Sequence, residues 1–224
     1  GVPLKGKRGD LLLKVRVCHP AKLSRRAKKL FEDLRDEGMA PEKLKAIIIT
    51  HGHADHAGGA KWFKDKFGTR IIAGQGDEGM LTTGKNEKLC PTDDMARDRL
   101  EEDQHATYKP IKADQLIPAD GKIPLQDVAG IAGTILSLPG HTAGSLIVSL
   151  NEVVLVGDLF RGAIVGSSAV RHFYMCDIPD NDRDIQAVLK TIAPKAHTFL
   201  PGHFGPVSRS EVQAAFPHTG ALRR

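Results

Sequence analysis

The sequence predicts an α/β protein in which short hydrophobic strands alternate with amphipathic helices. Its 224 residues are 41% hydrophobic and 26% charged, which suits a globular chain with one main aliphatic core. Runs of β-branched residues alternate with segments whose apolar residues recur every three or four positions. Histidines and aspartates follow several of the predicted strands directly. These observations predict a sheet-based scaffold that presents polar side chains at its strand ends.

Residues 1–38 are predicted to form a strand and a helix that pack on the main domain. Alternating apolar and polar residues predict the strand over 11–17. A single apolar stripe predicts the helix over 24–37, with Ser24 as its N-cap and Gly38 as its terminator. This opening segment is basic.

The basic excess of the chain is confined to its beginning. Residues 1–35 contain 11 Lys and Arg against 3 Asp and Glu, a balance of +8, whereas residues 36–224 contain 21 against 24, a balance of −3. A mildly acidic body offers no general attraction to a phosphate backbone. We therefore expect no nucleic-acid partner.

The main domain is predicted to span residues 39–224. Its expected strands lie over 45–50, 69–73, 131–138, 145–150, 152–156 and 198–200, and its expected helices over 62–67, 184–192 and 210–216. The polar stretch over about 75–110 has little strand character, apart from one helical pattern over 93–103. It is predicted to be a lid insertion.

Membrane insertion and disulfide bonding are not expected. The apolar runs fall far short of the roughly 18 residues that a membrane helix requires. Cys18, Cys90 and Cys176 lie far apart in the sequence and form no CxxC pair, which argues against a disulfide framework and a thiolate zinc site. A cytoplasmic location is therefore expected, although a removed leader stays open because the chain begins with Gly1.

Seven residues of metal-ligand type directly follow predicted strands. His51, His53, Asp55 and His56 form an HxHxDH pattern after the strand over 45–50, and later strands are followed by His141, Asp158 and His203. Loops at strand ends hold ligands rigidly and still face an open cavity. In so tight a loop, the first two histidines can converge on one cation while Asp55 and His56 reach a second. Imidazole ligands suit zinc, iron and manganese.

These motifs resemble those of the metallo-β-lactamase superfamily of hydrolases. THGHADHAGGA is similar to its signature, and PGHT, VGDLF and PGHFGP follow in the family's order, so the resemblance covers residues 45–207. It implies a four-layer αββα sandwich of two mixed sheets between outer helices. It also implies that one metal is held by His51, His53 and His141, a second by Asp55, His56 and His203, and that Asp158 bridges them. The intact ligand set favours an enzyme.

The beginning of the chain departs from the family pattern. Members usually open with a β-hairpin and a strand that ends in an IDTG-like loop, whose aspartate supports the histidine loop, and residues 1–50 contain no such motif. The opening sheet is therefore expected to be shortened, with exposed edges. Because unpaired strand edges invite pairing, we expect a homodimer.

The expected chemistry follows from two divalent metal ions, with zinc as the first choice and iron or manganese as alternatives. Such ions lower the pKa of a shared water and polarise a substrate oxygen. A metal-bridging hydroxide is then the expected nucleophile, and Asp55 is the catalytic residue expected to orient it and shuttle its proton. The sequence has no GxSxG elbow that would supply a protein nucleophile.

The expected substrate is a small ester, thioester or lactone. The resemblance implies a family that also contains β-lactamases, phosphodiesterases and nucleases, but Asp158 argues against β-lactamase branches without a bridging aspartate. The acidic body argues against long nucleic acids. Four residues after Asp158 are candidate substrate contacts: Arg161, Arg171, His172 and Tyr174.

Two alternative functions remain at this point. The first is a mononuclear iron sulfur dioxygenase in which only His51, His141 and Asp158 hold metal. The second is a chaperone-associated or interaction module with a vestigial metal site. Residues 6–34 motivate it, because they resemble the last strand and helix of the C-terminal domain of DnaJ-type co-chaperones.

Overall fold

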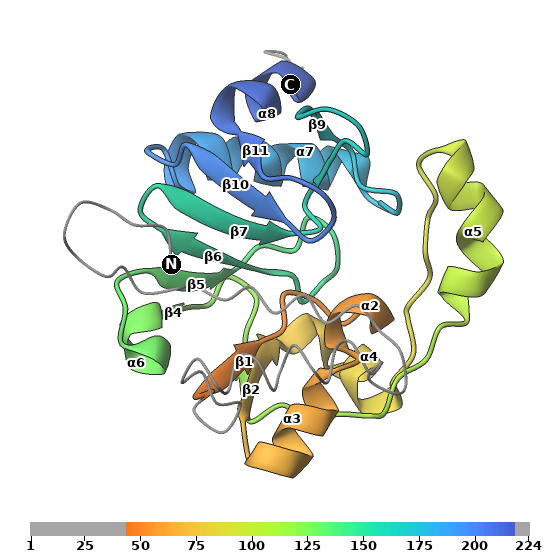
Figure 1. The fold of residues 1–224 in the computed structure, drawn as a ribbon, viewed down its shortest axis with the longest axis vertical. Coiled ribbons are helices and arrows are strands. Elements are labelled where there is room, and N and C mark those ends of the chain that lie inside the picture. The colour runs from red at the N-terminus through yellow and green to blue at the C-terminus, as the bar shows by residue number, and fades with distance from the viewer. Residues whose placement is uncertain (1–43, 218–224) are drawn as a thin grey trace.

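Two sheets pack face to face, and helices cover their outer faces, in a computed structural model that describes residues 44–217 (Figure 1). The strand expected over 11–17 and the helix expected over 24–37 lie outside the described residues. Of the helices within the described part, none combines the length and the apolar character needed to cross a membrane.

The smaller sheet contains three parallel strands in chain order, β1 (Ala46–Ile48), β2 (Arg70–Gly74) and β3 (Gln115–Ile117). Its outer face is covered by α2 (Ala54–Ala57), α3 (Ala60–Phe67) and α4 (Glu78–Thr83). Side chains alternate along the strands, so that Ile47 and Ile71 pack toward these helices while Ile48 and Ile72 face the other sheet. Residues of the β-branched run over 45–50 therefore make apolar contacts on both faces of the smaller sheet, as the composition of the run predicts.

The larger sheet contains six strands in the order β11-β10-β7-β6-β5-β4, in which β10 and β7 are parallel and the other neighbours antiparallel. The strands are β4 (Lys122–Pro124), β5 (Thr134–Ser137), β6 (Leu146–Leu150), β7 (Val153–Gly157), β10 (Thr198–Pro201) and β11 (Val207–Ser208). Helices α7 (Ile178–Ala187) and α8 (Arg209–Ala215) pack on its outer face, where Val154 and Val156 meet Ile185 and Val212. A short helix, α6 (Leu125–Ala129), follows β4, and a small ribbon joins β8 (Arg161–Gly162) to β9 (Ala169–Val170).

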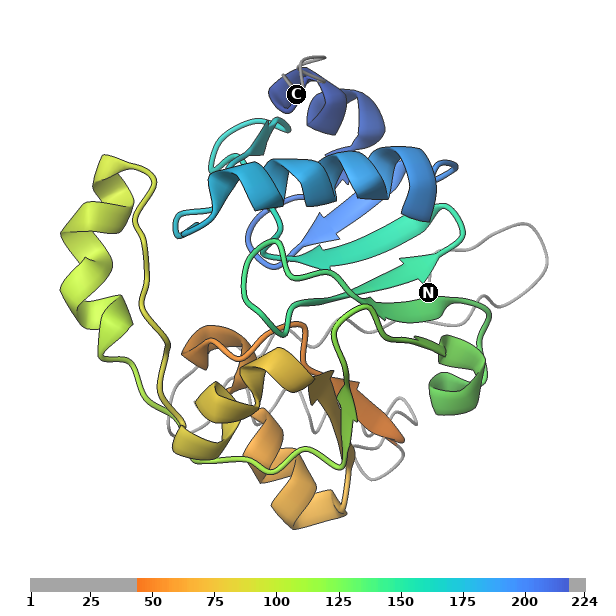
Figure 2. The ribbon, with the colours of Figure 1, turned by 180° about the vertical axis from the view of Figure 1, so that it is seen from behind.

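An apolar cluster fills the space between the sheets and completes the layering. Ile72 and Ile117 of the smaller sheet pack there with Ile135, Leu146 and Val148 of the larger one. Helices, sheet, sheet and helices thus form four layers (Figures 1 and 2). The predicted αββα architecture is confirmed, although the described strands of the smaller sheet are all parallel and only the larger sheet is mixed.

Helix α7 begins earlier than its apolar pattern predicts. It starts at Ile178, whereas the pattern predicts a start at residue 184, because the Asp177 carboxylate caps it by accepting a hydrogen bond from the Asp180 backbone N–H at 2.9 Å. Its last turn continues as a π-helical turn over Val188–Ile192.

Residues between β2 and β3 leave the body of the protein as a long excursion. A 3₁₀ turn at Gln75–Asp77 leads into α4, and an extended run then reaches α5 (Asp94–Gln104), which stands apart from both sheets (Figures 1 and 2). The Asp93 carboxylate caps α5 by accepting a hydrogen bond from the Ala96 N–H at 2.8 Å. The helix expected over 93–103 is therefore present within one residue at each end.

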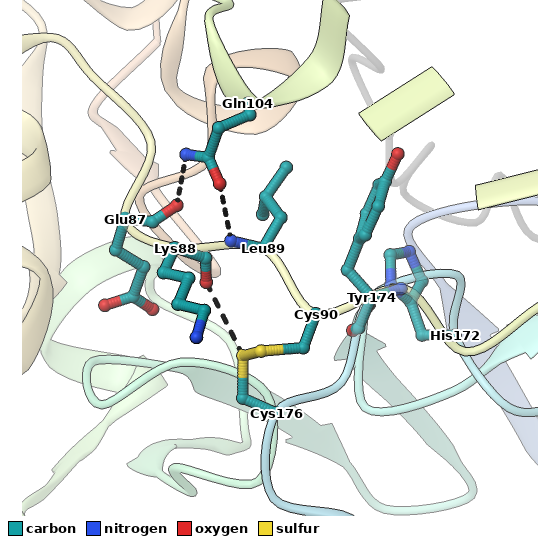
Figure 3. The surroundings of a disulfide bond; sticks show 8 residues. All are labelled: Glu87, Lys88, Leu89, Cys90, Gln104, His172, Tyr174 and Cys176. Atoms are coloured by element: carbon teal, nitrogen blue, oxygen red, sulfur yellow. Dashed lines mark hydrogen bonds between the residues drawn. A yellow bond between two sulfur atoms is a disulfide. The ribbon is translucent and has the colours of Figure 1, made fainter. Parts of the chain in front are cut away.

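A disulfide bond between Cys90 and Cys176 ties this excursion to the segment between β9 and α7 (Figure 3). The expectation of unpaired cysteines was wrong for these two. The two cysteines are 86 residues apart in the sequence, so only the folded chain brings them together. Pro91 and Tyr174 form an isolated antiparallel β-bridge beside them, and the Met175 N–H donates to the Cys90 carbonyl at 2.8 Å. The cysteine argument for a cytoplasmic location loses its support.

Candidate metal centre

The HxHxDH segment lies where β1 ends and α2 begins. His51 and His53 are buried, His56 is partly buried, and the Asp55 side chain is 52% exposed. The backbone at His53 is extended, and the chain turns into α2 at the next residue. This turn places the first two histidines on the inner side of the loop and Asp55 on its open side.

Three hydrogen bonds from other elements hold the histidine loop. The Gly52 N–H donates to the Asp77 carboxylate at 2.7 Å, and the Gly52 carbonyl accepts from the Tyr108 hydroxyl at 2.7 Å. The Ala54 N–H donates to the side-chain oxygen of Asn86 at 2.8 Å. The loop therefore depends on side chains that come from the excursion between β2 and β3.

The other three predicted ligands lie at strand ends of the larger sheet. His141 follows β5, Asp158 follows β7 and His203 follows β10. The Gly202 N–H donates to the Gly157 carbonyl at 2.6 Å, which continues the β7–β10 pairing beside the ligands. Position 202 requires glycine, because a Cβ atom there would lie 2.0 Å from Oδ1 of Asp158.

Six of the seven residues form two groups of facing donor atoms. In the first group, the ligand atoms of His51, His53 and His141 lie within 4.8 Å of one another, and Nδ1 of His53 is 3.1 Å from Nε2 of His141. In the second, Oδ2 of Asp55 lies 3.0 Å from Nε2 of His203 and 3.3 Å from Nε2 of His56. Both groups match the sets that the family resemblance implies.

Asp158 lies between the two groups. Its Oδ2 is 3.1 Å from Nε2 of His56 and 3.3 Å from Nε2 of His203, in the second group. The same oxygen is 3.5 Å from Nε2 of His51 and 4.0 Å from Nε2 of His141, in the first. One carboxylate oxygen is thus surrounded by histidine nitrogens from both sides.

This donor set fits divalent cations. Nε2 of His56 and Nε2 of His203 face each other at 3.2 Å, an arrangement that two ligands of one ion adopt without repulsion. Among the described residues, seven buried side-chain polar atoms have no hydrogen-bond partner, and five of them lie here, on His51, His53, His141, Asp158 and His172. Two of these atoms, Nε2 of His51 and Nε2 of His172, approach Oδ2 of Asp158. Because buried polar groups are normally paired, they indicate a site for a cation there.

The electrostatics of the metal-free cluster separate its histidines into two kinds. Burial holds the pKa of His51 and His141 well below the usual value and lowers that of His53 to about 4. Burial also opposes the charged form of His56 and His203, but Asp158 and Asp55 outweigh it and raise their pKa values to about 10 and about 9.

The two carboxylates are shifted in the opposite direction. Burial opposes their charge, but the neighbouring histidines keep the pKa of Asp158 and of Asp55 well below the usual range. Because metal ligands must be neutral imidazoles, cation binding would release protons from His56 and His203.

A cavity of about 350 Å³ adjoins the cluster. Asp55, Asp158 and His203 line it together with residues of α5. Apolar side chains dominate the rest of the lining, among them Leu89, Met95, Ile164, Phe173 and Phe204. Arg99 and Asp103 of α5 add charge.

The four candidate substrate contacts divide into two pairs. His172 and Tyr174 line the cavity. Arg161 is buried away from it, where Nη2 lies 3.3 Å from Asp93 and the guanidinium stacks 4.0 Å from the Phe173 ring centre. Arg171 hydrogen-bonds to the side chains of Asn181 and Asp182, at 3.0 and 2.8 Å. Neither arginine is among the described residues that line the cavity.

Asp77 is the functional residue that the sequence reasoning missed. It is almost completely buried, and besides Gly52 it accepts hydrogen bonds from the Thr142 hydroxyl and the Gly144 N–H, both at 2.8 Å. It therefore joins the histidine loop to the loop that carries His141. Burial raises its pKa.

The sequence carries no local signal for Asp77, because the close packing that places it is a tertiary contact. The backbones of Gly74 and Gly144 approach so closely that a Cβ at position 74 would lie 1.9 Å from the Gly144 oxygen. Asp77 gives the histidine loop the support expected from the aspartate of the IDTG-like loop, which residues 1–50 lack.

The chain is similar to curated bacterial hydrolases over part of its length. It is 34% identical over 129 residues to the hydroxyacylglutathione hydrolase GloC of Haemophilus influenzae, and this match covers 54% of this chain and 52% of that protein. It is 29% identical over 161 residues to the hydroxyacylglutathione hydrolase of Shewanella pealeana, and this match covers 68% of this chain and 49% of that protein. The chain thus spans about half the length of these relatives.

Solved structures share the fold. The DIM-1 metallo-β-lactamase superposes with a TM-score of 0.56 at 18% identity, over 86% of this chain and 75% of that one. The Rm3 metallo-β-lactamase gives a TM-score of 0.54 at 20% identity, over 79% of this chain and 64% of that one. At these identities the likeness concerns the fold alone.

The sequence family can be assigned from most of the chain. The model of the metallo-β-lactamase superfamily matches residues 20–203, which include the six residues of the two facing groups and Asp158. Together with the four-layer fold and the converging histidines, this match shows that the chain belongs to the metallo-β-lactamase superfamily.

Proposed function

We propose that this protein is a dinuclear metal-dependent hydrolase that cleaves a small ester, thioester or lactone, with zinc as its metal. The observation that carries the proposal is the pair of donor groups that face Asp158 beside a cavity. One group would hold each ion, and Asp158 would be shared. When bound, two such ions acidify a water molecule and polarise a substrate carbonyl as Lewis acids.

Asp55 is the residue best placed to handle the proton of the attacking water. Its carboxylate is 52% exposed and lines the cavity, whereas Asp158 is buried. Its contacts with His56 and His203 hold its pKa well below the usual range, so it stays an acceptor at neutral pH. It would orient the water and accept its proton.

The size and lining of the cavity support a small substrate with an apolar part. A volume of about 350 Å³ lies within the range of about 300–1,000 Å³ that is typical of small-molecule sites. Met95, Ile164 and Phe204 give the cavity an apolar part of its lining. The names of the two hydroxyacylglutathione hydrolases favour a thioester within the proposed class.

The test is hydrolysis of thioester, lactone, phosphodiester and β-lactam substrates by the wild type and by Asp55→Ala, with metal content measured in parallel. We expect turnover of a thioester or a lactone, about two zinc ions per wild-type chain, and a rate lower by about 10²–10⁴-fold in Asp55→Ala. The matched control is Asp127→Ala, which removes an exposed aspartate on α6 and should hydrolyse normally.

Two results would overturn the proposal. Equal hydrolysis rates for the wild type and Asp55→Ala would contradict the proposed mechanism. One iron ion per chain, with no hydrolysis of any substrate, would favour the mononuclear dioxygenase instead.

A further inference from the structure

We propose that His172 is an additional ligand of the metal centre. The inference rests on the proposed function, since both require cations among these residues. Nε2 of His172 lies 2.9 Å from Oδ2 of Asp158, closer than the corresponding atom of any of the four predicted histidine ligands around that oxygen. With Asp158 and His141 it forms a further group of converging donor atoms.

The approach of His172 to Asp158 does not have the geometry of a hydrogen bond. Nε2 is buried and has no hydrogen-bond partner in the described part of the chain, despite the short distance. His51 stands in the same relation to Asp158, with a buried, unpartnered Nε2 at 3.5 Å from the same oxygen. A buried nitrogen that approaches a carboxylate oxygen without bonding to it is arranged as a metal ligand is beside a second ligand.

The second ring nitrogen of His172 faces the backbone of Tyr174. Nδ1 lies 3.3 Å from the Tyr174 carbonyl oxygen and 3.2 Å from the Tyr174 nitrogen, whose N–H is directed at it. Metal binding through Nε2 requires the proton on Nδ1, where it is donated to the carbonyl, and a backbone carbonyl is a common partner of metal-bound histidine. The opposite tautomer, in which Nδ1 accepts from the Tyr174 N–H, would make His172 a hydrogen-bond donor to Asp158 instead.

The backbone around His172 is held more firmly than that of an ordinary loop. The Thr92 hydroxyl donates to the His172 carbonyl at 2.7 Å, and the Thr92 N–H donates to the Phe173 carbonyl at 2.8 Å. The Cys90–Cys176 disulfide closes the same pairing a few residues further on, and Figure 3 shows His172 and Tyr174 beside it. The ring, which is 3% exposed, is thereby fixed against Asp158.

Proton NMR of the cobalt(II)-loaded protein tests this assignment directly. Each histidine that binds cobalt gives one strongly shifted, solvent-exchangeable ring N–H signal. The five predicted histidine ligands and His172 should give six such signals in the wild type, and His172→Phe should give five. The matched control is His105→Phe, which removes an exposed histidine at the end of α5 and should keep all six.

Cobalt affinity, measured by competition with a chelator, distinguishes a ligand from a hydrogen-bond donor. Loss of a ligand should weaken binding by more than about 10-fold in both His172→Phe and His172→Gln. If His172 only donated a hydrogen bond to Asp158, the glutamine amide could replace it, and the affinity of His172→Gln would return to the wild-type value. That return would overturn the proposal.

The count in the wild type decides the matter even when a variant fails to fold. Five signals in a wild-type protein that binds cobalt and hydrolyses substrate would exclude His172 as a ligand and leave the proposed function intact. A wild type that binds no cobalt and no zinc would overturn both.

Discussion

The loop that carries His51 to His56 and the loops that carry Asp158 and His203 are held in place differently. The first leaves a three-stranded sheet, and its backbone is fixed by the side chains of Asp77, Asn86 and Tyr108. The others leave neighbouring parallel strands of a six-stranded sheet, and a backbone hydrogen bond between Gly202 and Gly157 continues the strand pairing up to the ligands.

This difference shows where the site is vulnerable to substitution. Side chains support the histidine loop, so replacing one of them should loosen it without unfolding the sheet. Asp158 and His203 depend on backbone pairing and close packing, so they should tolerate loss of supporting side chains but not added volume. Each of the following variants tests one side of that contrast.

Gly202→Ala should have the largest effect. The added Cβ would lie 2.0 Å from Oδ1 of Asp158 and 2.6 Å from Cε1 of His56, so the ligands of both sheets must move apart. We expect almost no zinc to remain after dialysis, as measured by elemental analysis. Gly79→Ala is the control, because a Cβ at that position of α4 meets nothing within 4 Å. Full metal retention in Gly202→Ala would contradict the packing argument.

Asp77→Asn should weaken metal binding without preventing it. The amide nitrogen would face N–H donors, so at least one of the contacts with Gly52, Thr142 and Gly144 is lost. Substitution of groups that support metal ligands typically costs about 10–100-fold in affinity, and we expect a loss in this range from chelator competition. Asp127→Asn is the exposed control. An unchanged affinity in Asp77→Asn would mean that the histidine loop is stable without its carboxylate support.

Tyr108→Phe should have a smaller effect that falls on stability. The variant removes the hydroxyl that donates to the buried Gly52 carbonyl and leaves the ring in place. Leaving a buried acceptor without its donor costs about 2 kcal/mol in the free energy of unfolding. Urea unfolding of the metal-loaded protein measures this loss. A variant as stable as the wild type would show that this hydrogen bond contributes nothing to the loop.

The strands and the seven candidate ligands were predictable because each depends on local sequence. A β-branched run followed at once by histidine or aspartate identifies a strand end, and strand ends of neighbouring strands meet at one edge. The structure brings all seven residues together. The short strands β3 and β4 escaped prediction because three residues of mixed polarity carry no period.

Features that depend on tertiary contacts were not predictable. The Cys90–Cys176 pairing joins segments that only the folded excursion brings together, and Arg161 finds Asp93 by the same route. The strand and helix predicted for the opening residues, and the segment that resembles a co-chaperone, lie outside the described part of the chain. Self-association stays a prediction.

Asp184→Asn should have the smallest effect, because it alters a side chain beneath the larger sheet. Burial and the nearby Asp180 raise the pKa of the Asp184 carboxyl to about 6, although the Gly140 backbone hydrogen bond stabilises its charged form. The folded protein therefore binds a proton at a higher pH than the unfolded chain does. The cost of holding the charge is fully present above pH 6 and disappears as the pH falls below about 4.

Replacing this carboxyl by a neutral amide should therefore stabilise the protein at pH 8 and leave it unchanged near pH 4. After allowance for solvent screening of a partly exposed group, the gain at pH 8 should be about 1 kcal/mol. Urea unfolding of Asp184→Asn and the wild type at both pH values measures it. A loss of stability at pH 8, or of metal affinity, would show that the His141 loop needs the Asp184 charge in addition to its contacts with Asp77.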